Sequence, residues 1–211
     1  MKPVAIFGGT FDPVHLGHLR AAWEASEQLD AEVRMLPAHV PPHRPPTRAS
    51  AAQRVALLRA ALQGQDRLRL DTRELEREGP SYSVDTLLDL RRELGADVPL
   101  VMLVGADAFA GLDRWYRWQQ LFELAHIGVL TRPGHAPDTS PALAEAVAPR
   151  RCREPAQLAA SPCGRVATLP VTALDIAAST VREQLAAGRV PRYLLPEALL
   201  ADPALLDVYR H

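Results

Sequence analysis

The chain has 211 residues, of which 47% are hydrophobic and 23% are charged, and its formal net charge is −1. These values are typical of one globular domain and argue against nucleic acid or a membrane surface as a partner. No apolar run is long enough to cross a bilayer, and the amino-terminal residues show no signal-peptide pattern. Cys152 and Cys163 have no neighbours at zinc-ligand spacing, so we expect reduced thiols in a cytoplasmic protein.

Short apolar runs alternate along the chain with segments of helical spacing. Ser50 and Ser83 are expected helix N-caps, Gly188 is an expected helix end, and the proline-rich residues 37–46 predict an extended loop. Residues 135–162 give no clear pattern. The apolar runs predict strands at residues 4–7, 32–36, 68–70, 99–104, 127–130 and 166–169. The helical spacing predicts helices at residues 15–29, 51–62, 83–94 and 179–187.

This alternation predicts an α/β fold: a Rossmann-like, doubly wound, mostly parallel sheet with helices on both faces. We expect one domain over residues 1–211, in which residues 170–211 form a small C-terminal helical part. Ligands of such folds bind beyond the carboxyl ends of the strands. The unusual residues follow strand ends, at 8–18, in the proline loop, at 105–107 and at 131–134.

Residues 8–18 read GGTFDPVHLGH, and we call them the motif loop. Gly8 and Gly9 let the backbone turn sharply and approach a ligand. His15 and His18 share one face of the first helical turn, where free N–H groups and the helix dipole favour an anion. Gly17 costs the helix ~1 kcal/mol relative to Ala, and we expect it to leave room for a ligand. The segment therefore predicts a polyphosphate site.

The motif loop resembles that of the HxGH nucleotidyltransferases, and in detail that of the bacterial nicotinate-nucleotide adenylyltransferase family, which reads GGTFDPxHxGH. Residues 37–44 resemble the family's PxxxPPH[KR] loop, and residues 79–87 its GPSYTxxTL segment, with Ser83 replacing Thr. Gly105-Ala106-Asp107 followed by Trp115 resembles its GxD…W arrangement, and residues 131–134 its RPG segment. The late ISSTxxR motif departs from the family pattern, because Ala177 and Ala178 stand where the family has serines.

The resemblance implies transfer of AMP from ATP to nicotinate mononucleotide, which gives deamido-NAD and pyrophosphate. It implies that His18 stabilises the α-phosphate in the transition state and that His15 contacts the ATP phosphates. Arg182 would neutralise the β- and γ-phosphates, and the alternative is a solvated side chain that balances Glu183. Mg²⁺ would arrive with ATP and be held by phosphate oxygens and water, without a dedicated protein metal site. The expected ATP contacts are Gly8, Gly9, Thr10, Phe11, His15, His18, Ser179 and Arg182.

The acceptor site is expected around the start of the helix at residue 83. A helix N-terminus favours a carboxylate over a neutral amide, which is a reason to choose nicotinate over nicotinamide. Asp107 could accept hydrogen bonds from sugar hydroxyls or cap a helix. Trp115 and Trp118 have helical spacing; we expect Trp115 to stack on the pyridine ring and Trp118 to pack in the core. The candidate acceptor contacts are Tyr82, Ser83, Thr86, Asp107, Trp115, Arg132, His43 and Arg44.

Arg132 would hold the phosphate of the mononucleotide, and His43 with Arg44 would close over the phosphates; the alternative for all three is a solvated loop charge. A homodimer is one expected assembly.

Three other functions remain open. They are an adenylyltransferase for nicotinamide mononucleotide or phosphopantetheine, a tRNA-binding module and a dinucleotide oxidoreductase. The motif loop lacks the GxGxxG pattern of the last class, and no KMSKS-like motif supports the second.

Overall fold

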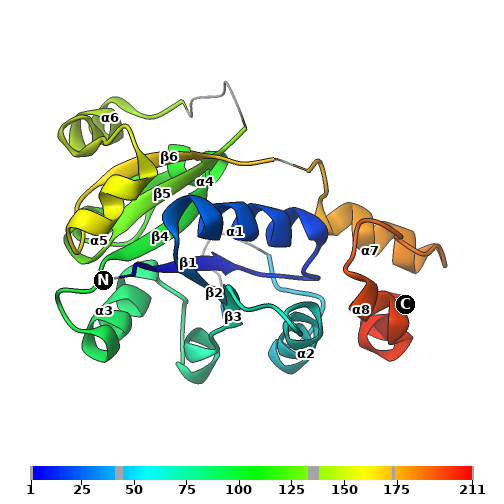
Figure 1. The fold of residues 1–211 in the computed structure, drawn as a ribbon. Helices are drawn as coiled ribbons and strands as arrows, with labels where there is room; N and C mark the ends of the chain where they lie inside the picture. The colour runs from blue at the N-terminus through cyan, green and yellow to red at the C-terminus, as the bar shows by residue number, and fades with distance from the viewer. Residues whose placement is uncertain (1, 41–44, 133–137, 173, 211) are drawn as a thin grey trace.

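The computed structural model describes residues 2–40, 45–132, 138–172 and 174–210 (Figure 1). Within these ranges a six-stranded sheet has the order β3-β2-β1-β4-β5-β6, and every neighbouring pair is parallel. The α/β fold with a parallel sheet is therefore confirmed. The strands are β1 (Val4–Gly9), β2 (Glu32–Pro37), β3 (Leu68–Leu70), β4 (Leu100–Gly105), β5 (His126–Thr131) and β6 (Val166–Pro170).

Helices connect the strands and follow the last one. The α-helices are α1 (Leu16–Leu29), α2 (Ala51–Ala61), α3 (Ser83–Leu94), α4 (Ala106–Ala110), α5 (Trp118–Leu124), α6 (Pro141–Val147), α7 (Ala178–Ala186) and α8 (Glu197–Ala201). The 3₁₀ turns are η1 (Arg73–Glu76), η2 (Leu112–Arg114), η3 (Ala148–Arg150), η4 (Pro155–Ala160) and η5 (Pro203–Tyr209). No helix in the described ranges has the length and apolarity that a bilayer crossing requires.

The sequence predicted all six strands and the four longest helices, with ends that differ by one or two residues. It missed α4, α5, α6 and α8, which have five to seven residues each, because so few turns show little periodicity. Ser50 caps α2 as expected, and its Oγ accepts from the Gln53 N–H at 3.3 Å. Ser83 is not an N-cap: the extended residue Tyr82 has that place, and Ser83 begins α3.

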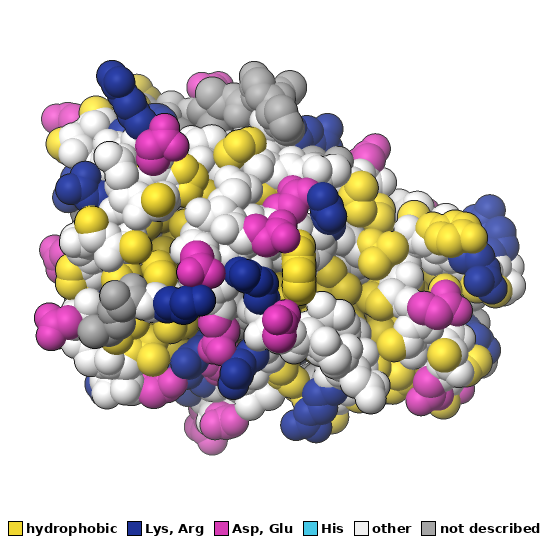
Figure 2. All heavy atoms as spheres, in the orientation of Figure 1, with side chains coloured by type: hydrophobic (Ala, Val, Ile, Leu, Met, Phe, Trp, Pro, Cys, Tyr) yellow, Lys and Arg dark blue, Asp and Glu magenta, His cyan; other side chains and the backbone are white. Residues whose placement is uncertain are grey.

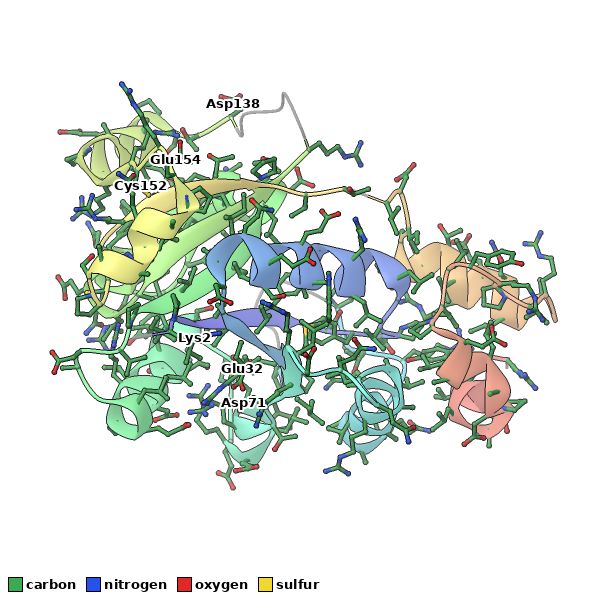
Figure 3. All side chains as sticks on the ribbon, viewed as in Figure 1. Lys2, Glu32, Asp71, Asp138, Cys152 and Glu154 are labelled. Carbon is green, nitrogen blue, oxygen red and sulfur yellow. The ribbon has the colours of Figure 1, made fainter. Side chains whose placement is uncertain are left out.

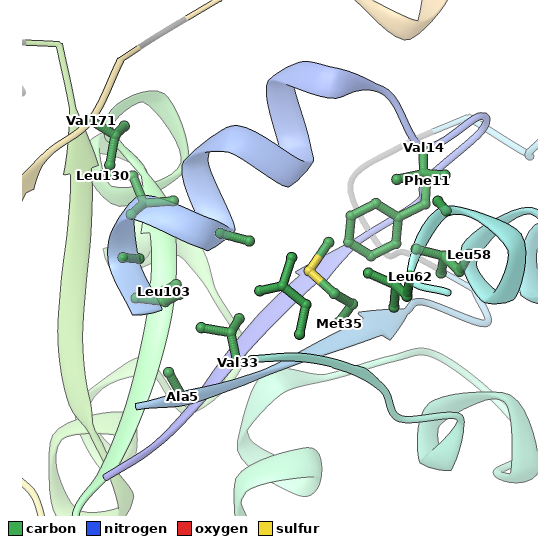
Figure 4. Packing of buried hydrophobic residues seen from close by; sticks show 14 of the residues in the cluster. Ala5, Phe11, Val14, Val33, Met35, Leu58, Leu62, Leu103, Leu130 and Val171 are labelled. Carbon is green, nitrogen blue, oxygen red and sulfur yellow. The ribbon is translucent and has the colours of Figure 1, made fainter. Parts of the chain in front are cut away.

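Each face of the sheet packs against its own hydrophobic core. In the first core, Ala5, Met35 and Leu103 pack with α1, α2, α7 and α8; Figure 4 shows Met35 beside Phe11 of the motif loop. In the second core, Ile6 and Met102 pack with α3, α4, α5 and α6. Successive strand residues therefore face opposite cores, as expected for a parallel sheet covered on both sides.

The strand order reverses between β1 and β4. From β1 the chain continues to β2 and β3 on one side, whereas β4, β5 and β6 lie on the other side. The pairing of β1 with β4 ends at Phe7 and Leu103, so Gly8, Gly9 and Gly105 extend beyond the last pair. Such a switch point opens a crevice at the carboxyl edge of the sheet, where α/β proteins bind their ligands.

The C-terminal helices return to this same edge. Figure 1 shows α7 and α8 beside the start of α1, and the N–H of Leu16 donates to the carbonyl of Leu194 at 2.9 Å. The motif loop is thus enclosed between the sheet edge and a segment that lies more than 150 residues later in the chain. Packing, and not local sequence, brings these two parts together.

Surface charges of both signs are mixed on the face seen in Figure 2, in keeping with the small net charge. One group of ion pairs joins β2 to η1 and α3. Arg34 Nη1 lies 2.8 Å from Glu93 Oε1 and 3.5 Å from Asp71 Oδ2, and its Nε lies 3.3 Å from Glu32 Oε1; Glu32 and Asp71 are labelled in Figure 3. Partly exposed pairs of this kind contribute little individually, and a shared network contributes more.

Candidate active site

The motif loop brings two imidazole rings together at the start of α1. His15 is the N-cap of the helix, with an extended backbone, and its ring stacks on that of His18 with centroids 3.7 Å apart. The His15 N–H donates to His18 Nδ1 at 3.3 Å. The expected pairing of these histidines on the first helical turn is therefore present in the structure.

Both histidines are neutral at pH 7. Burial lowers the pKa of His15 to about 4, and burial together with the neighbouring His15 lowers the pKa of His18 to about 3. Because Nδ1 of His18 accepts a hydrogen bond, the ring hydrogen of the neutral imidazole lies on Nε2. His18 is consequently a preorganised neutral donor, which needs no protonation before it can contact an oxyanion.

The glycines of the motif loop have different physical roles. A Cβ on Gly17 would lie 3.0 Å from His15 Nδ1, so Gly17 makes room for the His15 ring. The expectation that Gly17 leaves space for a ligand is therefore wrong, because the neighbouring imidazole fills that space. A Cβ on Gly9 would similarly lie 3.0 Å from the Phe11 ring. By contrast, no atom lies within 4 Å of the Cβ position of Gly8 or Gly105, and both residues are exposed at the strand ends.

Asp12 is the buried acid of the motif loop, with 5% of its surface exposed. Its Oδ2 accepts from the Arg48 N–H at 2.7 Å, and its Oδ1 accepts from the Ala49 N–H at 3.0 Å. The hydroxyl of Tyr209 also donates to Oδ1, at 2.8 Å. These donors fix the carboxylate inside the protein and leave it little capacity to contact a substrate.

Two arginines contact the same loop. Arg182, in the second turn of α7, donates from Nη1 to the Asp12 carbonyl at 2.7 Å, which places this expected phosphate ligand beside the histidines. Arg54, 1% exposed, donates from Nη1 to the Thr10 carbonyl at 2.8 Å. Sequence analysis missed Arg54, although a signal was present. It precedes Leu57 and Leu58 at helical spacing and so faces the same core as they do.

Ser179 and Phe11 occupy different surroundings at this edge. Ser179 is exposed in the first turn of α7, close in sequence to Arg182. Phe11 is fully buried and its ring packs edge-on against His18, with centroids 5.1 Å apart. Phe11 therefore supports the imidazole from within the core, whereas Ser179 is available to a ligand.

The start of α3 forms the second half of the site, and we call residues 79–86 the acceptor turn. The N–H groups of Asp85 and Thr86 both donate to the Tyr82 carbonyl. That of Ser83, a half-buried residue, has no partner in the part of the chain that the structure describes, whereas Val84 is fully buried. The Tyr82 ring lies 4.6 Å, centroid to centroid, from that of the exposed Tyr116. A free donor at a helix N-terminus beside an aromatic pair suits a planar, negatively charged group.

The structure corrects the expected role of Thr86. Its side chain is 1% exposed, and its hydroxyl donates to Glu74 Oε1 and accepts from Arg77 Nη2, each at 2.7 Å. Arg77 also pairs with Asp89 at 2.8 Å. Burial raises the pKa of the Glu74 carboxyl. Thr86 therefore holds the acceptor turn from inside and does not face a ligand.

The neighbouring loop is tied to the acceptor turn. The Ser81 N–H donates to the Val40 carbonyl at 2.9 Å, and the Ser81 Oγ accepts from the His39 N–H at 2.9 Å. His43 and Arg44, which we expect to close over phosphates, lie outside the described residues. The described end of their loop is nevertheless fixed to the acceptor turn by these two hydrogen bonds.

The remaining candidates follow strand ends. Asp107 is exposed in the first turn of α4, directly after β4, and Arg132 is exposed directly after β5. Trp115 is half-buried against the second core and ends η2. Trp118 also packs on that core but begins α5. Arg117 stands between the two tryptophans with φ +53°, so the expectation that they share one helix is wrong.

Comparison with known proteins shows the family to which this chain belongs. The model of the cytidylyltransferase-like family matches residues 6–183. The chain is 51% identical over 199 residues to the probable nicotinate-nucleotide adenylyltransferase of Methylococcus capsulatus, covering 93% of this chain and 94% of that one. It is 46% identical over 211 residues to the corresponding protein of Pseudomonas aeruginosa, covering 99% and 98%.

Solved structures share the fold at low sequence identity. The Plasmodium falciparum nicotinic acid mononucleotide adenylyltransferase complexed with NaAD has a TM-score of 0.70 and 12% identity, covering 100% of this chain and 99% of that one. A Vibrio parahaemolyticus structure described as a putative nicotinate-nucleotide adenylyltransferase has a TM-score of 0.63 and 16% identity, covering 100% and 97%. By its family model and its curated relatives, this chain belongs to the cytidylyltransferase-like family, among the nicotinate-nucleotide adenylyltransferases.

Proposed function

We propose that this enzyme transfers the AMP part of ATP to the 5′-phosphate of nicotinate mononucleotide, forming deamido-NAD and pyrophosphate. The observation that carries the proposal is the stacked pair His15 and His18 beside Arg182, at the open strand ends Gly8 and Gly105. The relatives that share this activity in their names cover nearly the whole chain. The switch point of the sheet is where such a fold binds nucleotides.

In the proposed reaction a phosphate oxygen of the mononucleotide attacks the α-phosphorus of ATP in line. The bond from the α-phosphorus to the bridging oxygen breaks, and pyrophosphate leaves with the electron pair. No protein nucleophile is required, because nucleotidyl transfer depends on alignment and on donors directed at the developing charge. His18 donates from Nε2 to an α-phosphate oxygen, and this hydrogen bond strengthens as charge builds up in the transition state.

Arg182 supports the leaving group. Its guanidinium is permanently charged and is held next to the histidines by the Asp12 carbonyl. We place the β- and γ-phosphates between Arg182 and the first turn of α7, with Ser179 as a polar contact. His15, together with the backbone of Gly8, Gly9 and Thr10, completes the ATP side.

Mg²⁺ fits this site as a companion of ATP. In the described part of the chain, no group of three or more His, Cys, Asp or Glu residues could hold a metal. Asp12, the acid of the motif loop, already accepts three hydrogen bonds from described residues. The residues therefore suit a cation that triphosphate oxygens and water coordinate. When bound, Mg²⁺ would supply charge neutralisation on the phosphates, and Arg182 would add to it.

On the acceptor side, we place the nicotinate carboxylate at the free N–H group of Ser83, at the N-terminus of α3. The helix dipole of α3 favours a carboxylate there, whereas an amide would lack the charge. Trp115 and Tyr82 would contact the pyridine ring, Asp107 would accept from ribose hydroxyls, and Arg132 would pair with the phosphate. His43 and Arg44 would reach the phosphates from their loop.

The test is pyrophosphate release from ATP with three acceptors in parallel: nicotinate mononucleotide, nicotinamide mononucleotide and phosphopantetheine. We expect kcat/KM to be higher for the nicotinate substrate by roughly 10- to 100-fold, the range expected when one charge-assisted contact of about 1.5–3 kcal/mol is lost. Equal efficiency with the amide would contradict the role of the Ser83 N–H group. Turnover with phosphopantetheine alone would contradict the proposed acceptor.

A further inference from the structure

Tyr209 is a buried tyrosine far from the motif loop in sequence and in contact with it in space. It ends η5, is 0% exposed, and belongs to the first core. Its hydroxyl donates to Asp12 Oδ1 at 2.8 Å, across a separation of 197 residues. Burial and this hydrogen bond raise the pKa of the Tyr209 hydroxyl, so it remains a donor throughout the physiological pH range.

Asp12 transmits this contact to the histidines and to Arg182. Among the described residues, three groups donate hydrogen bonds to its carboxylate, and Tyr209 is the one side chain among these donors. Its own carbonyl accepts from Arg182 at 2.7 Å. The chain then passes through Pro13 and Val14, both buried, to His15. A rotation of Asp12 would therefore move the anchor of Arg182 and the start of α1 together.

The Tyr209 hydroxyl can be removed without changing the balance of charge around Asp12. Arg54 contacts the preceding Thr10 carbonyl from inside the protein, so two arginines and one carboxylate surround the loop. Removal of any of these charges would leave the others unbalanced in a buried place. Tyr209 is the neutral member, and replacement by Phe removes one hydroxyl while it keeps the ring in the core.

We propose that Tyr209 is a positioning residue for adenylyl transfer: through Asp12 it fixes the loop that carries His15 and His18 and the carbonyl that anchors Arg182. This inference rests on the proposed function, since it assumes that ATP binds at the motif loop. It assigns the Tyr209 hydroxyl, through Asp12, to the ATP side of the site. Among the described residues no hydrogen bond joins Tyr209 to the acceptor turn, and Tyr209 packs in the first core whereas Tyr82 and Val84 pack with the second.

The test is Tyr209→Phe, assayed by pyrophosphate release with each substrate varied in turn. We expect kcat/KM for ATP to fall roughly tenfold, as for a lost hydrogen bond to a charged group. The KM for nicotinate mononucleotide should stay within about twofold, because its contacts lie elsewhere. An unchanged kcat/KM for ATP, or a rise in the KM for nicotinate mononucleotide as large as the fall in kcat/KM for ATP, would overturn the proposal.

Leu206→Ala provides the matched control. Leu206 is 2% exposed in the same turn η5 and packs in the first core, with no polar contact to Asp12. A cavity there destabilises the turn at least as much as Tyr209→Phe does. If Tyr209 acts only through general stability, Leu206→Ala will reduce kcat/KM for ATP equally, and the positioning role will be refuted. We expect it to lower Tm while kcat/KM for ATP stays within about twofold of the parent, measured well below Tm.

A double-mutant cycle with Asp12→Asn tests whether the Tyr209 hydroxyl acts through the Asp12 carboxylate. If the hydroxyl acts through Asp12, its removal will cost less kcat/KM in the Asp12→Asn background than in the parent. Additive losses would contradict the route through Asp12.

The parent enzyme separates the two proposals: no pyrophosphate release with any acceptor would refute the proposed function. Normal release by the parent and by Tyr209→Phe alike would refute only the role of Tyr209.

Discussion

The motif loop and the acceptor turn are both held by a buried carboxyl group, but its partners come from different distances along the chain. Asp12 in the motif loop accepts from residues 36, 37 and 197 positions away. Thr86 in the acceptor turn bonds to Arg77 and Glu74, which are 9 and 12 positions away. One half of the site therefore requires the C-terminus of the chain to be in place, whereas the described hydrogen bonds of the other half reach no farther than His39, 42 positions away.

This difference separates the consequences of mutation in the two halves. The hydrogen bonds of the acceptor turn close shorter loops than the bond from Tyr209 to Asp12 does, and a shorter loop costs less conformational entropy to close. The motif loop depends on α7 and η5, so damage far away in sequence reaches the ATP side. We therefore expect substitutions around Asp12 to affect ATP and substitutions around Glu74 to affect the acceptor.

The largest effect is expected for His18→Ala, which removes the donor proposed for the α-phosphate. Turnover should fall by roughly 10²- to 10³-fold, as when one donor to a developing oxyanion is lost. The KM for nicotinate mononucleotide should change little. Steady-state kinetics and thermal unfolding of the same preparation provide the measurement. Near-normal turnover of a folded variant would remove His18 from the mechanism.

Gly17→Ala tests whether Gly17 serves the His15 ring. The new Cβ would lie 3.0 Å from His15 Nδ1 and would displace the ring by a few tenths of an ångström. We expect kcat/KM for ATP to fall about tenfold, because alignment at the phosphate is sensitive to such shifts. Stability should hold or rise, since Ala favours a helix by ~1 kcal/mol over Gly.

The control for this variant is Gly111→Ala. Gly111 has φ −107° and no atom within 4 Å of its Cβ position. It should leave the kinetics with ATP unaltered. If Gly17→Ala has full activity, the close approach of residue 17 to the His15 ring does not affect catalysis.

Glu74→Gln should have a smaller effect, confined to the acceptor. It changes the group that receives the Thr86 hydroxyl and thereby loosens the acceptor turn. We expect the KM for nicotinate mononucleotide to rise several-fold, on the order of 1 kcal/mol for one weakened buried hydrogen bond. The KM for ATP should be unchanged. Glu76→Gln in the same turn η1 is the matched control, because Glu76 is exposed. An increase in the KM for ATP with Glu74→Gln would break the separation of the two halves.

The smallest expected effect is on the pH dependence of the free energy of unfolding, and its sign differs between the two halves of the site. His15 and His18 have folded pKa values of about 4 and about 3 against an ordinary 6.5, so they favour folding above pH 6.5 and lose this contribution as the pH falls. The pKa of Glu74 is raised above 4.5 by burial, so its contribution is present below pH 4.5 and is lost as the pH rises through the raised value.

Urea unfolding at pH 4.5 and pH 7.5 would measure these contributions. Relative to the parent, His18→Gln should reduce the loss of stability at the lower pH, by at most about 1.4 kcal/mol per pH unit. Glu74→Gln should change the pH dependence in the opposite direction. A change of the same sign in both variants would show that the two buried groups do not titrate as their environments require.

Particular residues show how far the sequence could predict this site. His15 and His18 lie where the motif and the helical spacing placed them, and Arg182 lies beside them. Asp12 was visible only as one letter of the motif, because its donors are remote. Thr86 was assigned to the ligand side because a motif gives the position of a residue but not the direction of its side chain.

Short residue patterns were enough to predict the strands, the long helices, the family and the two histidines, because each pattern involves residues that lie close together along the chain. Folding of distant segments was needed to show that Tyr209 and Arg54 hold the motif loop, that Gly17 makes room for His15, and that Thr86 faces inward. The difference arises because periodicity and capping are local. Buried hydrogen bonds, by contrast, form between whichever polar groups the packing of distant segments brings together.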